Sequence, residues 1–212
     1  MPDEPRTRSV KISEDERLGW SSDRPRRDGE PPRAASLSVR SRVLSPSPQI
    51  RYPPGSLLIV LSPSSAERER FVERLIGDRA SLLSLDKVRA LLAGRASEED
   101  IADRAVEILD AAVLKRLEAN ETVVIVPESL GADERERYVR MAARFKRSSH
   151  LILVETSRDG VHADDLAPLN ELRRRLDAGE LGAEGFKTAM RIGGESLAEL
   201  KRIVFQHPPR DD

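Results

Sequence analysis

Short, continuous apolar runs alternate along the chain with longer stretches in which apolar residues recur three and four positions apart. The short runs predict strands, and the longer stretches predict helices. The predicted strands cover residues 57–61, 81–85, 122–126, 150–155 and 187–192. The predicted helices cover residues 66–76, 86–93, 97–119, 133–146, 169–181 and 195–205. Because the strands are apolar throughout, we expect an α/β fold with a five-stranded parallel sheet covered by helices on both faces.

Residues 1–50 lack this periodicity and are rich in Pro, Arg, Ser, Asp and Glu. Such a segment buries too little apolar surface to offset its conformational entropy, so we expect an extended or disordered N-terminal arm. Two features depart from a plain solvated linker. Trp20 is the chain's single tryptophan, and residues 37–43 alternate apolar and polar as an added strand does. Two interpretations stay open: a linker, or an arm that orders on a protein partner. The arm residues expected to bind are Trp20, Leu37, Val39 and Val43.

The chain of 212 residues therefore divides into the arm, an α/β domain at 51–206 and a polar tail at 207–212. Its net charge of −1 makes no overall case for a membrane or nucleic-acid partner, although local basic patches leave nucleic acid open. The absence of cysteine excludes disulfides and thiolate chemistry, and three scattered histidines argue against a histidine metal site. No apolar run approaches the roughly 20 residues of a membrane span, so we expect a cytoplasmic location or a place in a particle assembled inside the cell.

The stretch from Ser56 to Ile76 has the order of a phosphate-binding loop. A buried strand stops at Ser-Pro-Ser-Ser, and a helix follows. Ser64 or Ser65 is expected to cap that helix.

The chain from about Ser56 to Phe205 resembles the polynucleotide-kinase-like P-loop phosphotransferases, a P-loop NTPase family of AAA-type kinases, as a degenerate member. Three segments carry the resemblance. The first is Ser84 to Arg89, which matches the family's Ser-x-Asp-x-x-Arg. The others are residues 122–130, in the place of the family's third strand and its motif, and Glu184-Gly185-Phe186, before the last strand. The resemblance implies that Asp86 is a general base toward an acceptor hydroxyl. It also implies that Arg89 contacts the acceptor's phosphate and that ATP, bound with Mg²⁺, donates the phosphoryl group.

The sequence departs from this family where nucleotide is handled. A working P-loop, Gly-x-x-x-x-Gly-Lys-Ser/Thr, wraps phosphates with backbone amides, and its Lys and hydroxyl hold phosphate and Mg²⁺. The corresponding positions are Ser62, Glu67, Arg68 and Glu69. Both glycines are therefore missing, and the planar fork of Arg68 is no substitute for a Lys point charge. Each carboxylate set against a phosphate costs about 4 kcal/mol at 4 Å and an effective dielectric near 20.

Two further parts of the nucleotide site are altered. The family's Asp and Asn after the third strand fall at Val126 and Ser129, and the loop 156–167, where the family carries an arginine-bearing lid, is short and contains only Arg158. We therefore expect no bound cofactor.

Several candidate residues also have purely structural interpretations. Asp86 is suited to capping a helix, with Arg89 paired to it one turn later. The basic run 173–175 is either a phosphate or acidic-partner site or a solvated helix face near Glu171 and Asp177. His150 is expected at a surface or sheet edge, and Glu128 is a candidate acid without an evident partner.

The leading hypothesis is a non-catalytic pseudoenzyme of P-loop kinase fold. It would be a protein-binding or structural module, anchored by its arm in an assembly such as a multi-subunit particle. The first alternative is an ATP-dependent phosphotransferase in which Asp86 is the base and Ser64, Ser65 and Arg68 bind phosphate with ATP and Mg²⁺. The second is a non-catalytic binder of a nucleotide or phosphorylated ligand that uses Arg89.

Overall fold

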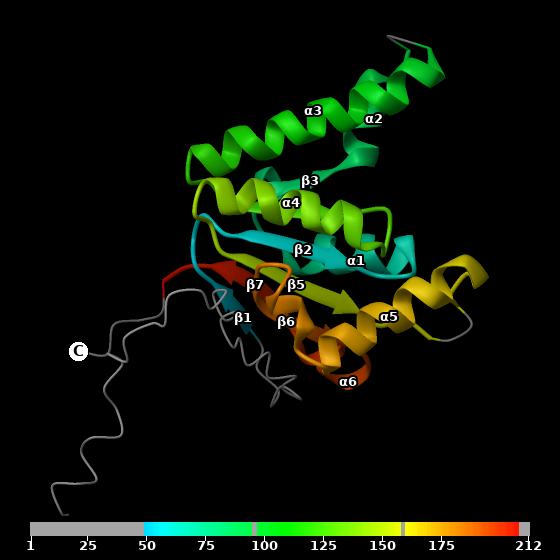
Figure 1. Cartoon of the computed structure of the whole chain (residues 1–212), viewed down its shortest axis with the longest axis vertical. Helices are drawn as coiled ribbons and strands as arrows, with labels where there is room; N and C mark the ends of the chain where they lie inside the picture. Colours follow the sequence, from blue (N-terminus) through cyan, green and yellow to red (C-terminus); the bar gives the residue numbers. More distant parts are fainter. Residues whose placement is uncertain (1–48, 95–96, 158–159, 208–212) are drawn as a thin grey trace, which may run out of the picture. The chain divides into compact units, whose positions relative to one another are not determined.

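The computed structural model describes residues 49–94, 97–157 and 160–207 (Figure 1). The expectations for the arm, with Trp20, Leu37, Val39 and Val43, concern residues outside these ranges, as do those for Arg158 and for residues 208–212.

Five parallel strands form the main sheet, in the order β3-β4-β2-β5-β6. Their bounds are β2 (Leu57–Leu61), β3 (Leu82–Ser84), β4 (Val123–Val126), β5 (Ser149–Val154) and β6 (Phe186–Ile192). The α/β fold with a five-stranded parallel sheet is confirmed. Every residue of β2, β4 and β5 is buried, because helices cover both faces of these inner strands.

Helices pack on both faces of this sheet (Figure 1). Their bounds are α1 (Ser65–Leu75), α2 (Leu85–Leu92), α3 (Glu98–Glu118), α4 (Ala132–Arg144), α5 (Leu166–Asp177) and α6 (Gly194–Glu199). Short 3₁₀ turns lie at Arg79–Ser81, Ala163–Asp165 and Glu180–Gly182. One core joins α3, α4 and α5 to Leu57, Ile59 and Leu61 of β2, and the other joins α1 to Leu58 and Val60. Alternate residues of one strand therefore supply two separate cores.

The predicted helix at 195–205 is wrong. Helix α6 ends at Glu199, and Arg202–Phe205 forms strand β7, which pairs in parallel with β1 (Gln49–Tyr52). The register places Ile50 opposite Ile203, and both side chains are buried. The helical spacing of the apolar residues misled the prediction, since the β-branched Ile203 and Val204 fit a strand once a partner strand is available.

The expectation that His150 is a surface or edge residue is also wrong. It lies in β5, between β2 and β6, and is only 2% exposed. The ring of Tyr52 covers it at a centroid distance of 4.4 Å, and its Nδ1 lies 2.8 Å from Thr188 Oγ1. Docking of β1 on the sheet, which local sequence does not reveal, buries this histidine. Burial lowers the pKa of His150 to about 4.

In the described part of the chain, no helix has the length and apolar character needed to cross a membrane.

Candidate functional site

Helices α1 and α4 leave two neighbouring strands, β2 and β4, toward opposite faces of the sheet. In an open parallel sheet such a reversal creates a crevice outside the carboxyl ends of the strands, where ligands generally bind. The place where such a crevice is expected lies between the segments after β2 and after β4.

The connection from β2 to α1 consists of Ser62, Pro63 and Ser64. The Ser64 amide donates to Ser62 Oγ at 3.2 Å, and the Glu67 amide donates to Ser64 Oγ at 3.3 Å. Ser64 is thus the helix cap, as one of the two predicted alternatives has it. Pro63 has no backbone N–H to donate. A phosphate-wrapping loop needs a succession of free amides. In this connection the Ser64 amide is engaged internally and Pro63 has none, and the Ser64 side chain also takes up the Glu67 amide of α1.

The residues at the Lys and hydroxyl positions of the motif lie within α1 itself. Arg68 is the fourth residue of the helix and is 6% exposed, whereas Glu69 is exposed. Among the described residues, the Arg68 guanidinium forms no hydrogen bond or ion pair, and its Nε atom is buried without a partner. A buried, unpaired donor is costly. Arg68 is therefore the residue of this crevice whose polar groups are least satisfied.

The charge of Arg68 acts on the start of α4. Burial raises the pKa of Glu134, in the first turn of α4, and the positive charge of Arg68 is among the influences that oppose this rise. Glu134 Oε2 also accepts a hydrogen bond of 3.3 Å from the Ser129 amide. The crevice thus holds one buried cation and one half-buried carboxylate near the beginnings of α1 and α4.

Asp86 and Arg89 lie at the end of β3, on the acceptor side that the family resemblance implies. Ser84, not Asp86, caps α2, because the Lys87 amide donates to Ser84 Oγ at 3.3 Å. The capping role predicted for Asp86 is therefore wrong. The side chain of Asp86 is 63% exposed. Its Oδ1 lies 3.5 Å from Arg89 Nη1, so the predicted pairing with Arg89 one turn later is confirmed.

Glu128 supplies the partner that the sequence did not reveal. Both terminal nitrogens of Arg89 donate to its carboxylate, with Nη2 at 3.2 Å from Oε2. This hydrogen bonding raises the pKa of Arg89. A fork-to-fork pair of this kind occupies the end-on pair of donors of the guanidinium. The arrangement therefore links the ends of β3 and β4, with Arg89 already neutralised.

A cavity of about 540 Å³ opens beside this pair, between α2, α3 and α4. Its polar wall includes Arg137, whose Nη2 donates to Tyr138 Oη at 3.0 Å and lies 3.6 Å from Asp110 Oδ1. Burial raises the pKa of Tyr138 to about 12, and it also raises the pKa of Asp110. Arg137 Nε lacks a hydrogen-bond partner in the described structure.

The Glu-Gly-Phe segment has a structural role that its place in the family motif does not indicate. Glu184 is 3% exposed and accepts from Arg135 Nε at 2.7 Å and Nη2 at 2.9 Å, while Arg175 Nη1 lies 2.7 Å from its Oε1. Gly185 adopts φ 102°, and a Cβ there would approach Val139 Cγ1 to 2.8 Å. The segment therefore fastens α4 and α5 to the start of β6.

The basic run Arg173–Arg175 is paired within the domain. Arg173 forms a two-point ion pair with Glu155, and Arg174 pairs with Glu171 and Glu180. These three arginines therefore present no unpaired cluster for a phosphate or an acidic partner.

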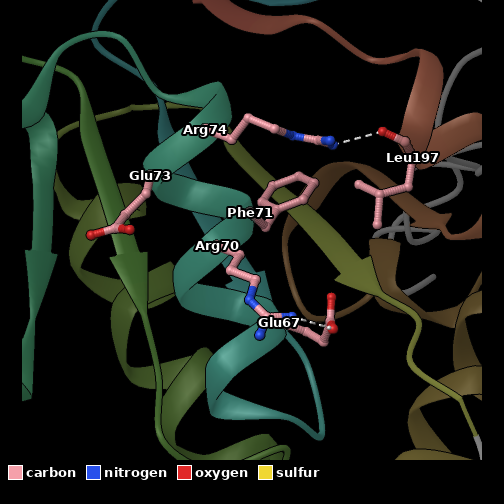
Figure 2. A pocket seen from close by; sticks show the side chains of 6 residues that line it. All are labelled: Glu67, Arg70, Phe71, Glu73, Arg74 and Leu197. Atoms are coloured by element: carbon pink, nitrogen blue, oxygen red, sulfur yellow. Dashed lines mark hydrogen bonds and ion pairs between the residues drawn. The ribbon is translucent and has the colours of Figure 1, made fainter.

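A second groove, of about 460 Å³, lies between α1 and α6 (Figure 2). Phe71 and Leu197 form its apolar part, Arg70 pairs with Glu67 at one end, and Arg74 Nη2 donates to the Leu197 carbonyl at 2.7 Å. The last contact holds the six-residue helix α6 against α1.

The described residues contain no group of three or more His, Cys, Asp or Glu side chains arranged to hold a metal ion. The residues at the phosphate and Mg²⁺ positions of the P-loop motif do not fit Mg·ATP either. The capped loop that contains Pro63 stands where free backbone amides are required, and the exposed carboxylate of Glu69 stands where a hydroxyl is required.

No protein-family model matches this chain, and no curated protein matches it. Among solved structures, it is similar to a protein of Chloroflexus aurantiacus J-10-fl described as a "putative kinase". The two are 15% identical, the match covers 65% of this chain and 84% of the other, and the TM-score is 0.44. A likeness at this level carries no argument about function.

Proposed function

We propose that this chain is a kinase-fold protein that does not turn over nucleotide and serves as a protein-binding module. One observation carries the proposal: the β2–α1 connection is closed on itself by the hydroxyls of Ser62 and Ser64. A phosphate group entering this loop would have to displace both hydrogen bonds and would meet Pro63, which donates none.

The acceptor side supports the same conclusion. Asp86 is a solvent-exposed carboxylate and does not line the cavity between α2, α3 and α4. Arg89 is held by Glu128, which accepts from both of its terminal nitrogens and neutralises its charge. A phosphotransferase needs both halves of the crevice, and neither half is arranged for catalysis.

The binding role rests on one of the two interpretations of the arm at residues 1–50, that it orders on a protein partner. Limited proteolysis of the full chain, alone and in a complex isolated with it, tests this part. Rapid cleavage within residues 1–50 in the free chain, with protection in the complex, is the expected result. Equal protection in both states would contradict the role of the arm.

Calorimetric titration of the full chain with Mg·ATP and Mg·GTP tests the loss of nucleotide handling. We expect no saturable binding at micromolar nucleotide. A phosphoryl-transfer assay with ATP and a panel of hydroxyl acceptors should show no transfer that the Asp86→Asn variant abolishes. Transfer that depends on Asp86 would instead establish the phosphotransferase alternative, with Arg68 as phosphate ligand.

A second candidate function is favoured by Arg68. Its buried Nε without a partner, near the amide-rich start of α1, is suited to a small anion such as a phosphate monoester that binds without catalysis. A ligand that binds only the folded state raises the melting temperature. Thermal-shift measurements with inorganic phosphate and phosphate monoesters should then show stabilisation in the wild type and none in Arg68→Met. Equal shifts in both proteins would reject this candidate.

A further inference from the structure

The cavity between α2, α3 and α4 has arginines in its wall, but their charges are already matched. Each of the arginines that line it has a carboxylate partner within the domain. The pairs are Arg89 with Glu128, Arg137 with Asp110, and Arg140 with Glu136. The charge that a ligand meets in this cavity is therefore set by the remaining groups of the wall.

Those remaining charged groups are carboxylates. Asp103 and Asp133 line the cavity, are exposed, and form no hydrogen bond or ion pair with another described residue. Glu134 accepts a hydrogen bond from the Ser129 amide at 3.3 Å but forms no ion pair in the described structure. Burial raises the pKa of Glu134, which reflects the cost of holding its charge away from water. The unmatched charge of the cavity is thus negative and favours a cation.

The same wall also holds hydrogen-bond donors that lack an acceptor. Tyr138 is fully buried, and its Oη accepts from Arg137 Nη2 at 3.0 Å, but its own proton has no acceptor among the described residues. Arg137 Nε is buried and likewise has no partner there. Buried donors without acceptors are costly. A ligand that satisfies this wall must therefore bring an acceptor oxygen as well as a positive charge.

The rest of the lining is apolar and comes from Leu85, Ala102 and Val106. A lysine residue in a peptide matches all three kinds of surface, because it has an aliphatic stem, an ammonium head and neighbouring backbone carbonyls. A polyamine has the stem and the charge but no acceptor oxygen. The cavity volume of about 540 Å³ lies within the range of about 300–1,000 Å³ that ligand sites occupy.

We propose that this cavity binds a lysine-bearing segment of a protein partner. The lysine ammonium lies among Asp103, Asp133 and Glu134, and a backbone carbonyl of the segment accepts from Tyr138 or Arg137. This inference rests on the proposed protein-binding function and adds to the arm a second binding surface, within the α/β domain.

Fluorescence anisotropy of the full chain with the labelled peptide Gly-Ala-Lys-Ala-Lys-Ala-Gly tests the charge requirement. We expect saturable binding at micromolar protein, and none of the peptide in which glutamine replaces both lysines. Asp103→Asn/Asp133→Asn, at two exposed positions, should weaken binding by at least about tenfold. Glu118→Gln/Glu199→Gln removes the same charge from exposed positions outside the cavity and should change the affinity less than about twofold. Absence of saturable binding, or equal weakening in both double variants, would overturn the proposal.

Blocking the cavity tests its location. The natural chain has no cysteine, so a maleimide reagent modifies only an introduced thiol. Ala102 lines the cavity, whereas the exposed Ala111 lies nine residues further along α3, on the opposite side of the helix. Modified Ala102→Cys should bind the lysine peptide at least about tenfold more weakly than modified Ala111→Cys. Equal affinities of the two modified proteins would place the peptide elsewhere and overturn the proposal.

Two further measurements distinguish other occupants. Spermidine should displace the peptide only at a concentration at least about tenfold above that of unlabelled peptide, because it offers no acceptor oxygen. Displacement at equal concentration would identify a polyamine site and overturn the proposal. In light scattering, a dimer that Asp103→Asn/Asp133→Asn dissociates would show that a second copy fills the cavity, which would also overturn it. No nucleotide enters these assays, so their failure leaves the loss of nucleotide handling untouched, and binding of Mg·ATP would refute that loss without affecting the peptide result.

Discussion

Replacing Arg68 with methionine should stabilise the protein, although most substitutions of buried residues destabilise. Arg68 is 6% exposed, and its Nε has no partner among the described residues. A buried donor without a partner costs about 1–3 kcal/mol. Methionine keeps an apolar stem of similar length in the space that the arginine stem fills, and it carries no donor. We therefore expect Arg68→Met to raise the free energy of unfolding by about 1–2 kcal/mol.

Urea unfolding followed by far-UV circular dichroism measures this change. For a domain of this size each 1 kcal/mol corresponds to a rise of about 2–4 °C in melting temperature, which offers a second reading. Arg70→Met is the matched control, because Arg70 lies in the same helix with 75% of its side chain exposed. The control should change stability by less than about 0.5 kcal/mol.

A loss of more than about 1 kcal/mol in Arg68→Met, with no loss in the control, would refute the reasoning. It would show that the guanidinium is compensated in the folded protein, for instance by the charge of Glu134. A gain would identify Arg68 as a residue that the fold retains at a cost in stability, which is typical of a binding residue.

Three other substitutions or conditions test the structure of the domain. Glu184→Ala should lower the free energy of unfolding by about 3–5 kcal/mol, because it leaves the buried Arg135 unpaired, whereas the exposed control Glu171→Ala should cost less than about 1 kcal/mol. As the pH falls from 6.5 to 4, the free energy of unfolding of the wild type, measured from urea midpoints, should fall by up to about 3 kcal/mol relative to that of His150→Gln. The reason is that the folded pKa of His150, about 4, lies below its ordinary value of 6.5, so the unfolded chain binds the proton first. A difference between the two proteins that does not change with pH would contradict this. Gly185→Ala should cost at least about 1–3 kcal/mol in the same assay, because its φ of 102° disfavours a side chain, and an unchanged midpoint would show that the turn relaxes.

The inner strands β2, β4 and β5 of the main sheet were predictable because each is a run of apolar residues buried on both faces. The signal is local, so it survives in a single sequence. The alternation of strands and helices then restricted the fold to a parallel α/β sheet.

The pairings that shape the site were not predictable in the same way. Arg89 meets Glu128 across 39 positions of sequence, and Arg135 meets Glu184 across 49. Each acid or base alone reads as an ordinary surface residue, and only the fold brings the partners together. The Glu184-Gly185-Phe186 segment was noticed through the family resemblance, but its buried ion pair has no local signal.

The small sheet was missed for a related reason. β1 and β7 are four residues long and lie at opposite ends of the described chain, so neither reaches the length at which a pattern is distinctive. The burial of His150 depends on Tyr52 of β1 and was missed with it. Similarly, the buried position of Arg68 follows from how α1 packs, which the P-loop alignment did not specify.

Isothermal titration of the full chain with Mg·ATP tests the central proposal, that the crevice beside the β2–α1 connection does not handle nucleotide. The closed β2–α1 connection predicts no saturable heat at micromolar nucleotide, in the wild type and in Arg68→Met alike. Micromolar binding that disappears in Arg68→Met would contradict the account and restore this crevice as a nucleotide site.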